Sequence, residues 1–220
     1  MTHRCNLRCL HCYLGDERSP GSAAAELDTA FWLSVVDQVA DAGCLNLLIT
    51  GGEPLLRDDF AEVYTRAKRR GLVVTLFTNG TRLDDGLLRL FAHLPPWYVE
   101  VSLYGATPET YDRVTTVRGA FERCLAGVDA LLAAGVRVGL KTVILRENRH
   151  EVDAMRALAE ARGTKFRVDP AVFPCLDGKT DPVEHRVDPV EAIAIEMADA
   201  QRLRKSVEYL DRVKDQPPLE

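Results

Sequence analysis

Apolar and polar residues follow two repeating patterns along this chain, one typical of strands and one typical of helices. Short continuous apolar runs bounded by turn residues predict strands in a parallel sheet, and apolar residues spaced three and four apart predict amphipathic helices. The runs predict strands over 44–50, 72–78, 98–103, 136–145 and 165–168. The first of them, 44–50, is expected to form a strand buried on both faces. Helices are predicted over 31–42, 59–70, 84–93, 121–134 and 151–162.

Capping residues support these boundaries. Asp28 precedes the first helix and Gly43 follows it, and Asn148 is expected to cap the helix over 151–162. Strands that alternate with helices predict an α/β fold, in which a parallel sheet is covered by helices and the crossovers are right-handed. This pattern allows either a barrel or a doubly wound sheet.

Polar loops follow three of the predicted strands. Their sequences are Thr50-Gly51-Gly52-Glu53-Pro54, Thr78-Asn79-Gly80 and Ser102-Leu103-Tyr104-Gly105. The carboxyl ends of parallel strands meet at one edge of a sheet, where binding and catalytic groups gather. We therefore expect these loops to converge on one site.

The pattern changes after residue 170. A stretch rich in proline and charge, 173–189, precedes one predicted long helix over 190–213. This change predicts a core over 1–170 and, over 171–220, a linker with a C-terminal helical appendage.

Composition narrows the function classes. The 220 residues, 46% of them hydrophobic, suit one domain, and a net charge of -5 gives no reason to expect a nucleic-acid partner. No segment approaches the roughly 20 apolar residues that cross a bilayer. We therefore expect a soluble, cytoplasmic protein without a membrane partner.

Three of the six cysteines, Cys5, Cys9 and Cys12, lie within eight residues. Such crowding predicts a metal ion or cluster rather than a disulfide framework. Cys44 and Cys124 lie in apolar surroundings and are expected to be inert core residues, whereas Cys175, beside a proline, is left open.

The number of thiolates decides the chemistry of this triplet. Three thiolates on a four-iron cluster leave one iron open to a substrate, whereas a structural zinc site normally has four protein ligands. The zinc alternative needs His3 or His11 as its fourth ligand. A chance grouping of unrelated buried cysteines is the other alternative.

The spacing Cys-x3-Cys-x2-Cys, with His11 before the last cysteine, resembles the cluster motif of the radical SAM superfamily. Gly51-Gly52-Glu53-Pro54 is similar to that family's motif for the methionine amino group of S-adenosylmethionine (SAM). The resemblance implies a [4Fe-4S] cluster on the three cysteines, with SAM as the second cofactor. Glycines allow close backbone approach and Glu53 supplies an acceptor. The alternative is a simple strand-ending turn with Glu53 in solvent.

The resemblance also implies roles for four further residues. Ser102 is similar to a residue that contacts the ribose or carboxylate of SAM, and Lys141 is expected to pair with that carboxylate. Asn79 is expected to line the pocket, and Tyr13 to cover the adenine. Each has a plainer alternative: a loop hydrogen bond for Ser102, a solvated rim for Lys141, a left-handed turn for Asn79 and packing against the cysteine loop for Tyr13.

Residues 102–121 resemble a subgroup that usually carries a C-terminal SPASM or related extension with further clusters. The fold implied is a partial (β/α)6 TIM-like barrel. Two departures are expected to matter. Only four residues precede Cys5, so the first strand of that barrel is expected to be missing, and only Cys175 follows residue 170, so no auxiliary cluster is expected.

The function implied is reductive cleavage of SAM to a 5'-deoxyadenosyl radical that abstracts hydrogen from a peptide or a small biosynthetic precursor. Flavodoxin or ferredoxin is expected to donate the electron, because the chain shows no flavin or nicotinamide fingerprint. Two alternatives are a non-catalytic zinc or iron-sulfur module and an inactive truncated fragment. The Gly-Gly-Glu-Pro turn argues against a merely structural module.

Overall fold

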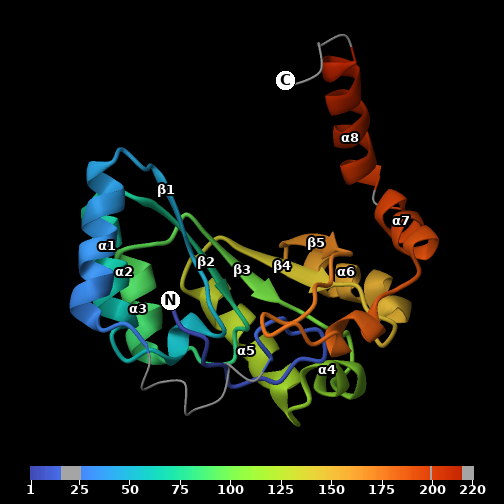
Figure 1. Cartoon of the computed structure of the whole chain (residues 1–220), viewed down its shortest axis with the longest axis horizontal. Helices are drawn as coiled ribbons and strands as arrows, with labels where there is room; N and C mark the ends of the chain where they lie inside the picture. The colour runs from blue at the N-terminus through green and yellow to red at the C-terminus, as the bar shows by residue number, and fades with distance from the viewer. Residues whose placement is uncertain (16–25, 199, 215–220) are drawn as a thin grey trace.

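A computed structural model describes residues 1–15, 26–198 and 200–214 of the chain (Figure 1). Its sheet contains five parallel strands that lie side by side in chain order. An unbroken order is typical of a barrel, whereas a doubly wound sheet reverses its order at a switch point. The strands are β1 Asn46–Ile49, β2 Val73–Thr78, β3 Tyr98–Ser102, β4 Val138–Val143 and β5 Lys165–Asp169.

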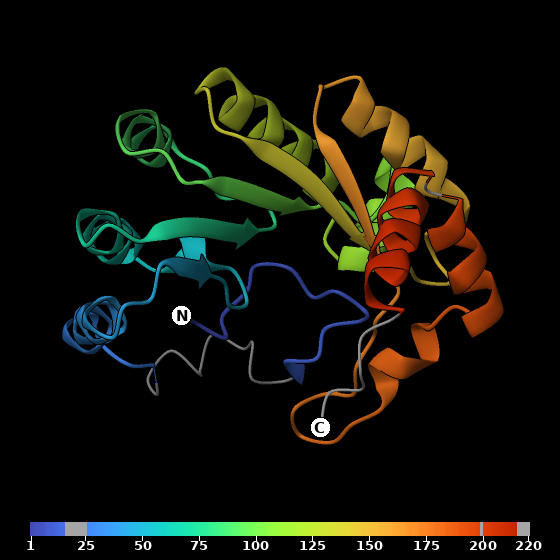
Figure 2. The ribbon, with the colours of Figure 1, turned by 90° about the horizontal axis from the view of Figure 1, so that it is seen from above.

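Helices cover the convex side of this curved sheet, as Figure 2 shows. The predicted alternation of strands and helices is thus confirmed. Asp28 caps the first helix by accepting a hydrogen bond from the Phe31 N–H at 2.8 Å, and Gly43 ends it with φ +80°. The covering helices are α1 Thr29–Asp41, α2 Phe60–Arg69, α3 Asp85–His93, α5 Ala120–Ala133 and α6 Val152–Glu160.

The two faces of the sheet differ in chemistry. Residues that point toward the helices, such as Leu76, Val101 and Leu140, are buried in the main core. On the concave face, the register places Ser102 beside Lys141 and Lys141 beside Arg167. The core therefore lies between sheet and helices, and the concave face is left for polar groups.

The first strand differs from its prediction. Leu48 is 48% exposed and Cys44 is exposed, so the predictions of a strand buried on both faces and of a core Cys44 are wrong. The reason is position: β1 lies at the edge of the five-stranded sheet, and Leu48 pairs with Thr75 on the open concave face. Cys124, on α5, is fully buried as predicted.

The pattern also missed a helix and misassigned a cap. The unpredicted helix α4, Pro108–Thr115, follows β3 and is capped by Thr107. Asn148 is wrong as a helix cap, since its side chain is buried and bonds instead to Leu145 N–H at 2.8 Å and to the carbonyl oxygens of Val143 and Tyr104. It fastens the loop after β4 to the loop after β3. Short 3-10 turns lie at η3 Pro54–Leu56, η4 Arg149–Glu151 and η5 Asp181–His185.

The carboxyl-terminal part has two helices where one was predicted. These are α7 Pro189–Met197 and α8 Ala200–Val213, and residue 199 between them lies outside the described residues. The preceding segment returns to the barrel, where Val172 and Val187 are buried. In Figure 1, α8 extends away from the sheet. Among the described helices, none has the length and apolar character that crossing a bilayer requires.

Gly127 on α5 allows the helix to touch the loop after β2, because a methyl group there would overlap the carbonyl oxygen of Gly80. Helix propensity alone favours Ala over Gly by about 1 kcal/mol. We predict the opposite sign for Gly127→Ala: overpacking should lower the free energy of unfolding, measured by urea denaturation, by about 2 kcal/mol.

Gly86, exposed on α3, is the matched control. A methyl group there would meet only the side chain of Asp84, at 3.1 Å. Gly86→Ala is expected to leave stability unchanged or to raise it by up to about 1 kcal/mol. Equal stabilisation by both substitutions would contradict the close approach of α5 to the Asn79 loop.

Candidate functional site

The segment that leads into Cys5 lies directly against the Gly-Gly turn. The carbonyl oxygen of Thr2 accepts a hydrogen bond from Gly52 N–H at 2.7 Å, and that of Arg4 accepts one from Glu53 N–H at 2.8 Å. A methyl group on Gly51 would overlap the Thr2 carbonyl oxygen, and one on Gly52 would overlap that of Arg4. The glycines are therefore required for close approach to this chain's own backbone.

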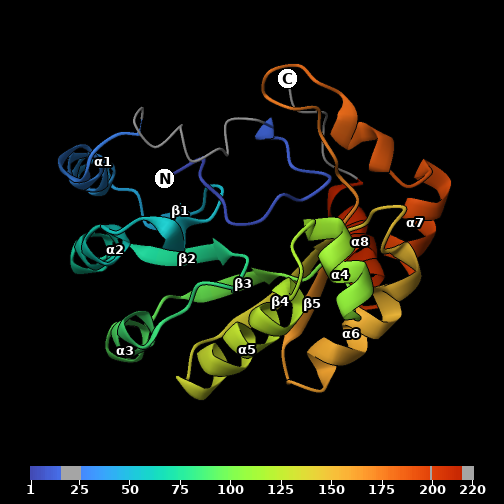
Figure 3. The same ribbon diagram turned by 90° about the horizontal axis from the view of Figure 1, so that it is seen from below.

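Helix α4 supports the cysteine loop from a second side (Figure 3). Arg8 N–H donates to the carbonyl oxygen of Thr115 at 3.0 Å, and Leu10 N–H donates to that of Val114 at 2.9 Å. These acceptors belong to the last turn of α4, whose carbonyls have no partners within the helix. Thr116, in the left-handed region at φ 54°, returns a hydrogen bond from its hydroxyl to the Arg8 carbonyl oxygen.

A carboxyl-terminal segment supports the third cysteine. The carbonyl oxygen of Tyr13 accepts from Leu176 N–H at 2.8 Å, and the Cys175 thiol donates to the carbonyl oxygen of Cys12 at 3.7 Å. Gly15, at φ +56°, lies beside the Cys175 side chain. In Figure 2 the orange segment runs beside the blue amino-terminal loop. Cys175, whose role the sequence left open, thus lies next to the cysteine triplet.

The phenol of Tyr104, which sequence reasoning named only as part of a loop, belongs to the surroundings of the cysteine triplet. Burial raises the pKa of Tyr104, and the neighbouring thiols of Cys9, Cys12 and Cys5 raise it further. One phenol therefore lies within electrostatic reach of all three cysteines. The only signal in the sequence was its place in the loop that follows β3.

Two other predicted site residues contact the same phenol. The His11 ring packs edge-on against the Tyr104 ring, with centroids 4.7 Å apart. The Ser102 side chain hydrogen-bonds with the Tyr104 hydroxyl and opposes the rise in its pKa. The structure thereby brings His11 and Ser102 to the cysteine triplet.

Cys5 has two hydrogen-bond donors at its sulfur. Leu7 N–H lies 3.4 Å from the Cys5 Sγ, and the Asn79 amide nitrogen lies 3.9 Å from it. Burial is the main cause that raises the pKa of Cys5 to about 11, the charges of Glu53 and Cys12 add to it, and the two donors oppose it. A metal at the sulfur would reverse this shift, because a coordinated thiol is deprotonated.

Asn79 lies at the site and is not the left-handed turn residue of the alternative. The positive φ, +73°, belongs to Gly80. Asn79 is buried, and its amide nitrogen also donates to the Asn6 side-chain oxygen at 2.9 Å. It joins the end of β2 to the start of the cysteine loop.

Glu53 is fully buried, so the alternative that places it in solvent is wrong. Its carboxylate accepts hydrogen bonds from Leu55 N–H at 3.1 Å, the Thr78 hydroxyl at 2.8 Å and Asn79 N–H at 2.7 Å. It thus ties the Gly-Gly-Glu-Pro turn to the end of β2, with Pro54 starting η3 beside it. Burial raises the pKa of Glu53 to about 7 against these hydrogen bonds.

Lys141 and Tyr13, the remaining predicted site residues, have partners of their own. The Lys141 ammonium forms an ion pair with Asp169 at 3.2 Å, so it is more than a solvated rim residue. Tyr13, 47% exposed, lines a cavity of about 600 Å³ together with Trp32, Gly51 and Leu176.

The zinc alternative was tested against the geometry. A structural zinc ion needs four ligands that converge at about 2.0–2.3 Å. Within residues 1–15, 26–198 and 200–214, no group of three or more His, Cys, Asp or Glu side chains is close enough to hold one metal ion. In the described part of the chain, the zinc alternative therefore lacks its set of converging ligands.

The buried Glu53 carboxylate predicts a pH dependence of stability. Its pKa is raised from the ordinary 4.5 to about 7, so near pH 6 the folded protein keeps a proton that the unfolded chain has released. Stability is therefore lost as the pH rises from about 5 to about 8, by about 3 kcal/mol for this one group. The check is the free energy of unfolding of the metal-free protein relative to its Glu53→Gln variant, across that window. A constant difference between the two proteins would show that Glu53 is ionised throughout.

Comparison with known proteins agrees with this geometry. Residues 1–159 match the family model of the Radical SAM superfamily. Among curated relatives, the chain is 34% identical over 160 residues to Fe-coproporphyrin III synthase of Methanosarcina barkeri, covering 73% of this chain and 39% of the relative. It is 35% identical over 165 residues to PqqA peptide cyclase of Gluconobacter oxydans, covering 74% and 45%. The chain thus spans less than half the length of these relatives.

Solved structures share the fold. SuiB of Streptococcus suis aligns with a TM-score of 0.69 at 17% identity, covering 96% of this chain and 45% of SuiB. SuiB bound to its precursor peptide SuiA aligns with a TM-score of 0.70 at the same identity, covering 97% and 45%. These likenesses support the partial barrel, and the family match covers the cysteine loop and the Gly-Gly-Glu-Pro turn. This chain belongs to the radical SAM superfamily.

Proposed function

We propose that the chain holds a [4Fe-4S] cluster on Cys5, Cys9 and Cys12 and cleaves SAM reductively, to start hydrogen abstraction from a peptide or a small biosynthetic precursor. The observation that carries this proposal is the backbone pairing of Thr2 and Arg4 with the Gly-Gly-Glu-Pro turn, which brings the start of the cysteine loop to that turn. The influence of all three thiols on the pKa of Tyr104 supports it. The superfamily to which the chain belongs uses a [4Fe-4S] cluster and SAM.

The donor set fits the cluster. Thiolates are the usual ligands of iron-sulfur clusters, and three of them leave one iron open for SAM. When bound, the cluster supplies one electron that splits SAM into methionine and a 5'-deoxyadenosyl radical. Leu7 N–H and the Asn79 amide, which donate to the Cys5 sulfur, stabilise its thiolate form and tune the potential of the site.

Apolar and aromatic groups cover part of the cysteine loop, in which all three cysteines are half-buried. Leu7 is buried in the main core, and the His11 and Tyr104 rings pack edge to face beside the cysteines. A dry pocket protects a reactive radical from side reactions. We assign this role to Leu7, His11 and Tyr104.

We assign backbone and side-chain groups of the site to different parts of SAM. The Glu53 carboxylate already has three protein donors, so its role toward the methionine amino group is shared with the backbone of Gly51 and Gly52. Ser102 and Lys141, neighbours in the β3–β4 register, face the polar side of the sheet and are assigned to the ribose and the carboxylate. Lys141 must then share its charge between that carboxylate and Asp169. Tyr13 is assigned to the adenine.

The substrate class rests on the relatives. One of them is named a PqqA peptide cyclase and another an Fe-coproporphyrin III synthase, and one structural neighbour holds a precursor peptide. These names support a peptide or a small biosynthetic precursor as substrate. We propose flavodoxin or ferredoxin as the electron donor.

The direct test is anaerobic reconstitution with iron and sulfide, then dithionite and SAM, with 5'-deoxyadenosine measured by chromatography. Wild type should bind about four irons and form the nucleoside. Cys9→Ala should lose both the cluster and the product, because two thiolates remain.

Cys44→Ala is the matched control, because Cys44 is an exposed cysteine outside the loop. It should retain wild-type iron, sulfide and product. A fully loaded wild-type protein that makes no 5'-deoxyadenosine would overturn the catalytic proposal. Loss of the cluster in Cys44→Ala would overturn the choice of ligands.

A further inference from the structure

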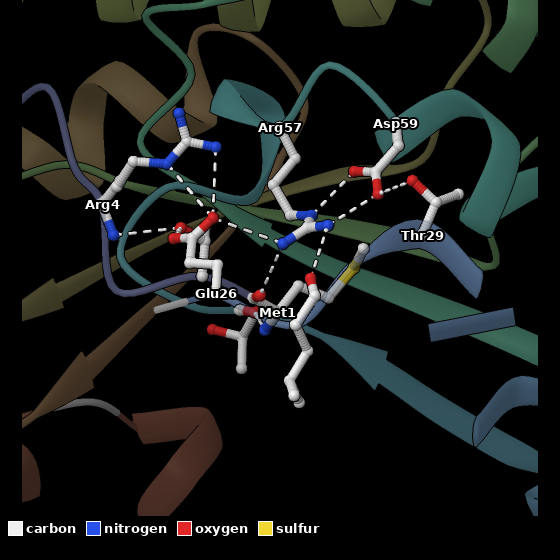
Figure 4. A network of polar contacts seen from close by, with 9 residues as sticks. Met1, Arg4, Glu26, Thr29, Arg57 and Asp59 are labelled. Atoms are coloured by element: carbon white, nitrogen blue, oxygen red, sulfur yellow. Dashed lines mark hydrogen bonds and ion pairs between the residues drawn. The ribbon is translucent and has the colours of Figure 1, made fainter. Parts of the chain in front are cut away.

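One buried arginine connects the start of the chain to the Gly-Gly-Glu-Pro turn. Arg57 is 8% exposed. It lies directly after η3, the 3-10 turn whose first residue is Pro54, the last residue of the motif. Figure 4 shows its guanidinium between Met1, Glu26 and Asp59. These partners come from the segment before Cys5, the segment before α1 and the residue that precedes α2.

All five N–H groups of this guanidinium have acceptors. The Nε and one terminal nitrogen form a bidentate pair with Asp59 at 2.7 and 2.6 Å. The remaining N–H groups donate to Glu26 at 3.3 Å, the Leu27 carbonyl oxygen at 3.2 Å and the Met1 carbonyl oxygen at 3.4 Å. A guanidinium has five donors in a fixed planar arrangement, so this set of positions is specific to arginine.

Glu26 binds the same segment from the other side of the network. Its carboxylate accepts from the Thr2 hydroxyl and from the Arg4 Nε, the latter at 3.2 Å. Burial opposes ionisation of Glu26, but hydrogen bonds from Thr2 and Arg4 and the charge of Arg57 hold its pKa below the ordinary value. Residues 1, 2 and 4 are therefore all tied to the Arg57–Glu26 pair.

The same short segment carries the carbonyl groups that pair with the Gly-Gly turn. Thr2 and Arg4 bind Gly52 and Glu53 through their backbones and Glu26 through their side chains. The next residue is Cys5. Its thiol position thus depends on a segment that is held on both sides and that forms no helix or strand of its own.

We propose that Arg57 is a positioning residue for the cysteine loop: with Glu26 it fixes residues 1–4 against the Gly-Gly turn and so sets the place of the Cys5 sulfur. This inference rests on the proposed function for its catalytic consequence. A buried ion pair is weak evidence for stability, and holding one conformation is a better-supported role for it. Arg57 acts through the backbone of this segment.

A second arginine, Arg66 on α2, provides the control. Arg66 makes an equivalent bidentate pair with Asp37, at 2.8 and 2.6 Å, but it is half-exposed and its pair joins only α1 and α2. Lysine keeps the charge of either arginine, but its three donors are on one nitrogen atom. It therefore cannot form the bidentate pair that a planar guanidinium forms with a carboxylate. Both variants lose a bidentate pair with an aspartate, but only Arg57→Lys also removes buried hydrogen bonds that link to residues 1–4.

The first experiment uses the cluster-free protein and does not depend on the proposed function. Amide hydrogen exchange is followed in peptides that cover residues 1–13. Arg57→Lys should speed exchange there on the order of tenfold, while Arg66→Lys leaves it at the wild-type rate. Unchanged exchange in Arg57→Lys would overturn the positioning role.

The second experiment uses the reconstituted protein and separates positioning from folding. Arg57→Lys and Glu26→Gln should keep the far-ultraviolet circular dichroism of wild type. Both should shift the electron paramagnetic resonance signal of the reduced cluster and its midpoint potential, and both should lower SAM cleavage by about 10- to 100-fold. Arg66→Lys should match wild type in all three measurements.

The outcomes distinguish the two proposals. Wild-type spectra, potential and cleavage in both Arg57→Lys and Glu26→Gln would overturn the positioning role while the proposed function stood. A wild-type protein that binds no cluster would overturn the proposed function, and the exchange measurement would still decide whether Arg57 holds the segment.

Discussion

The backbone pairing between residues 2–4 and the turn after β1 is the contact on which the rest of the site depends. Thr2 and Arg4 accept hydrogen bonds from Gly52 and Glu53, and side chains on the two glycines would occupy the space of those carbonyl groups. Because Cys5 follows immediately, this pairing places the cysteine loop at the carboxyl edge of the sheet. The Gly-Gly pair is therefore as much a support for the protein as a surface for a ligand.

A loop without regular structure keeps its shape only if its polar backbone groups find partners. Here those partners come from distant parts of the chain: the Gly-Gly turn, the last carbonyls of α4, and the segment around Leu176. Each support constrains a different cysteine. Cys5 is held through the turn, Cys9 lies between two residues that bond to α4, and Cys12 is flanked by the Cys175–Leu176 contacts. The site is assembled by tertiary contacts, which explains why it combines elements from both ends of the described chain.

The sheet could be predicted from sequence because its strands are local apolar runs ended by turn residues. The site was predicted through motifs, and the structure brings Cys5, Cys9, Cys12, His11, Asn79 and Ser102 together. Other features depend on neighbours that no local pattern records. Leu48 and Cys44 are apolar residues in an apolar run, but they are exposed because β1 is an edge strand. Asn148 is a residue type that often caps helices, but its side chain forms hydrogen bonds that join two loops. The sequence does not distinguish Arg57 from an exposed arginine, because its hydrogen-bond acceptors come mostly from segments distant in sequence.

We propose that three thiolates hold a four-iron cluster with one iron left for SAM. Mössbauer spectroscopy of protein reconstituted with ⁵⁷Fe, recorded before and after SAM is added, tests this ligand set most directly. We expect the signal of one iron in four to change on addition of SAM while the other three keep theirs. A spectrum of isolated single irons, or four irons that SAM leaves unchanged, would contradict it.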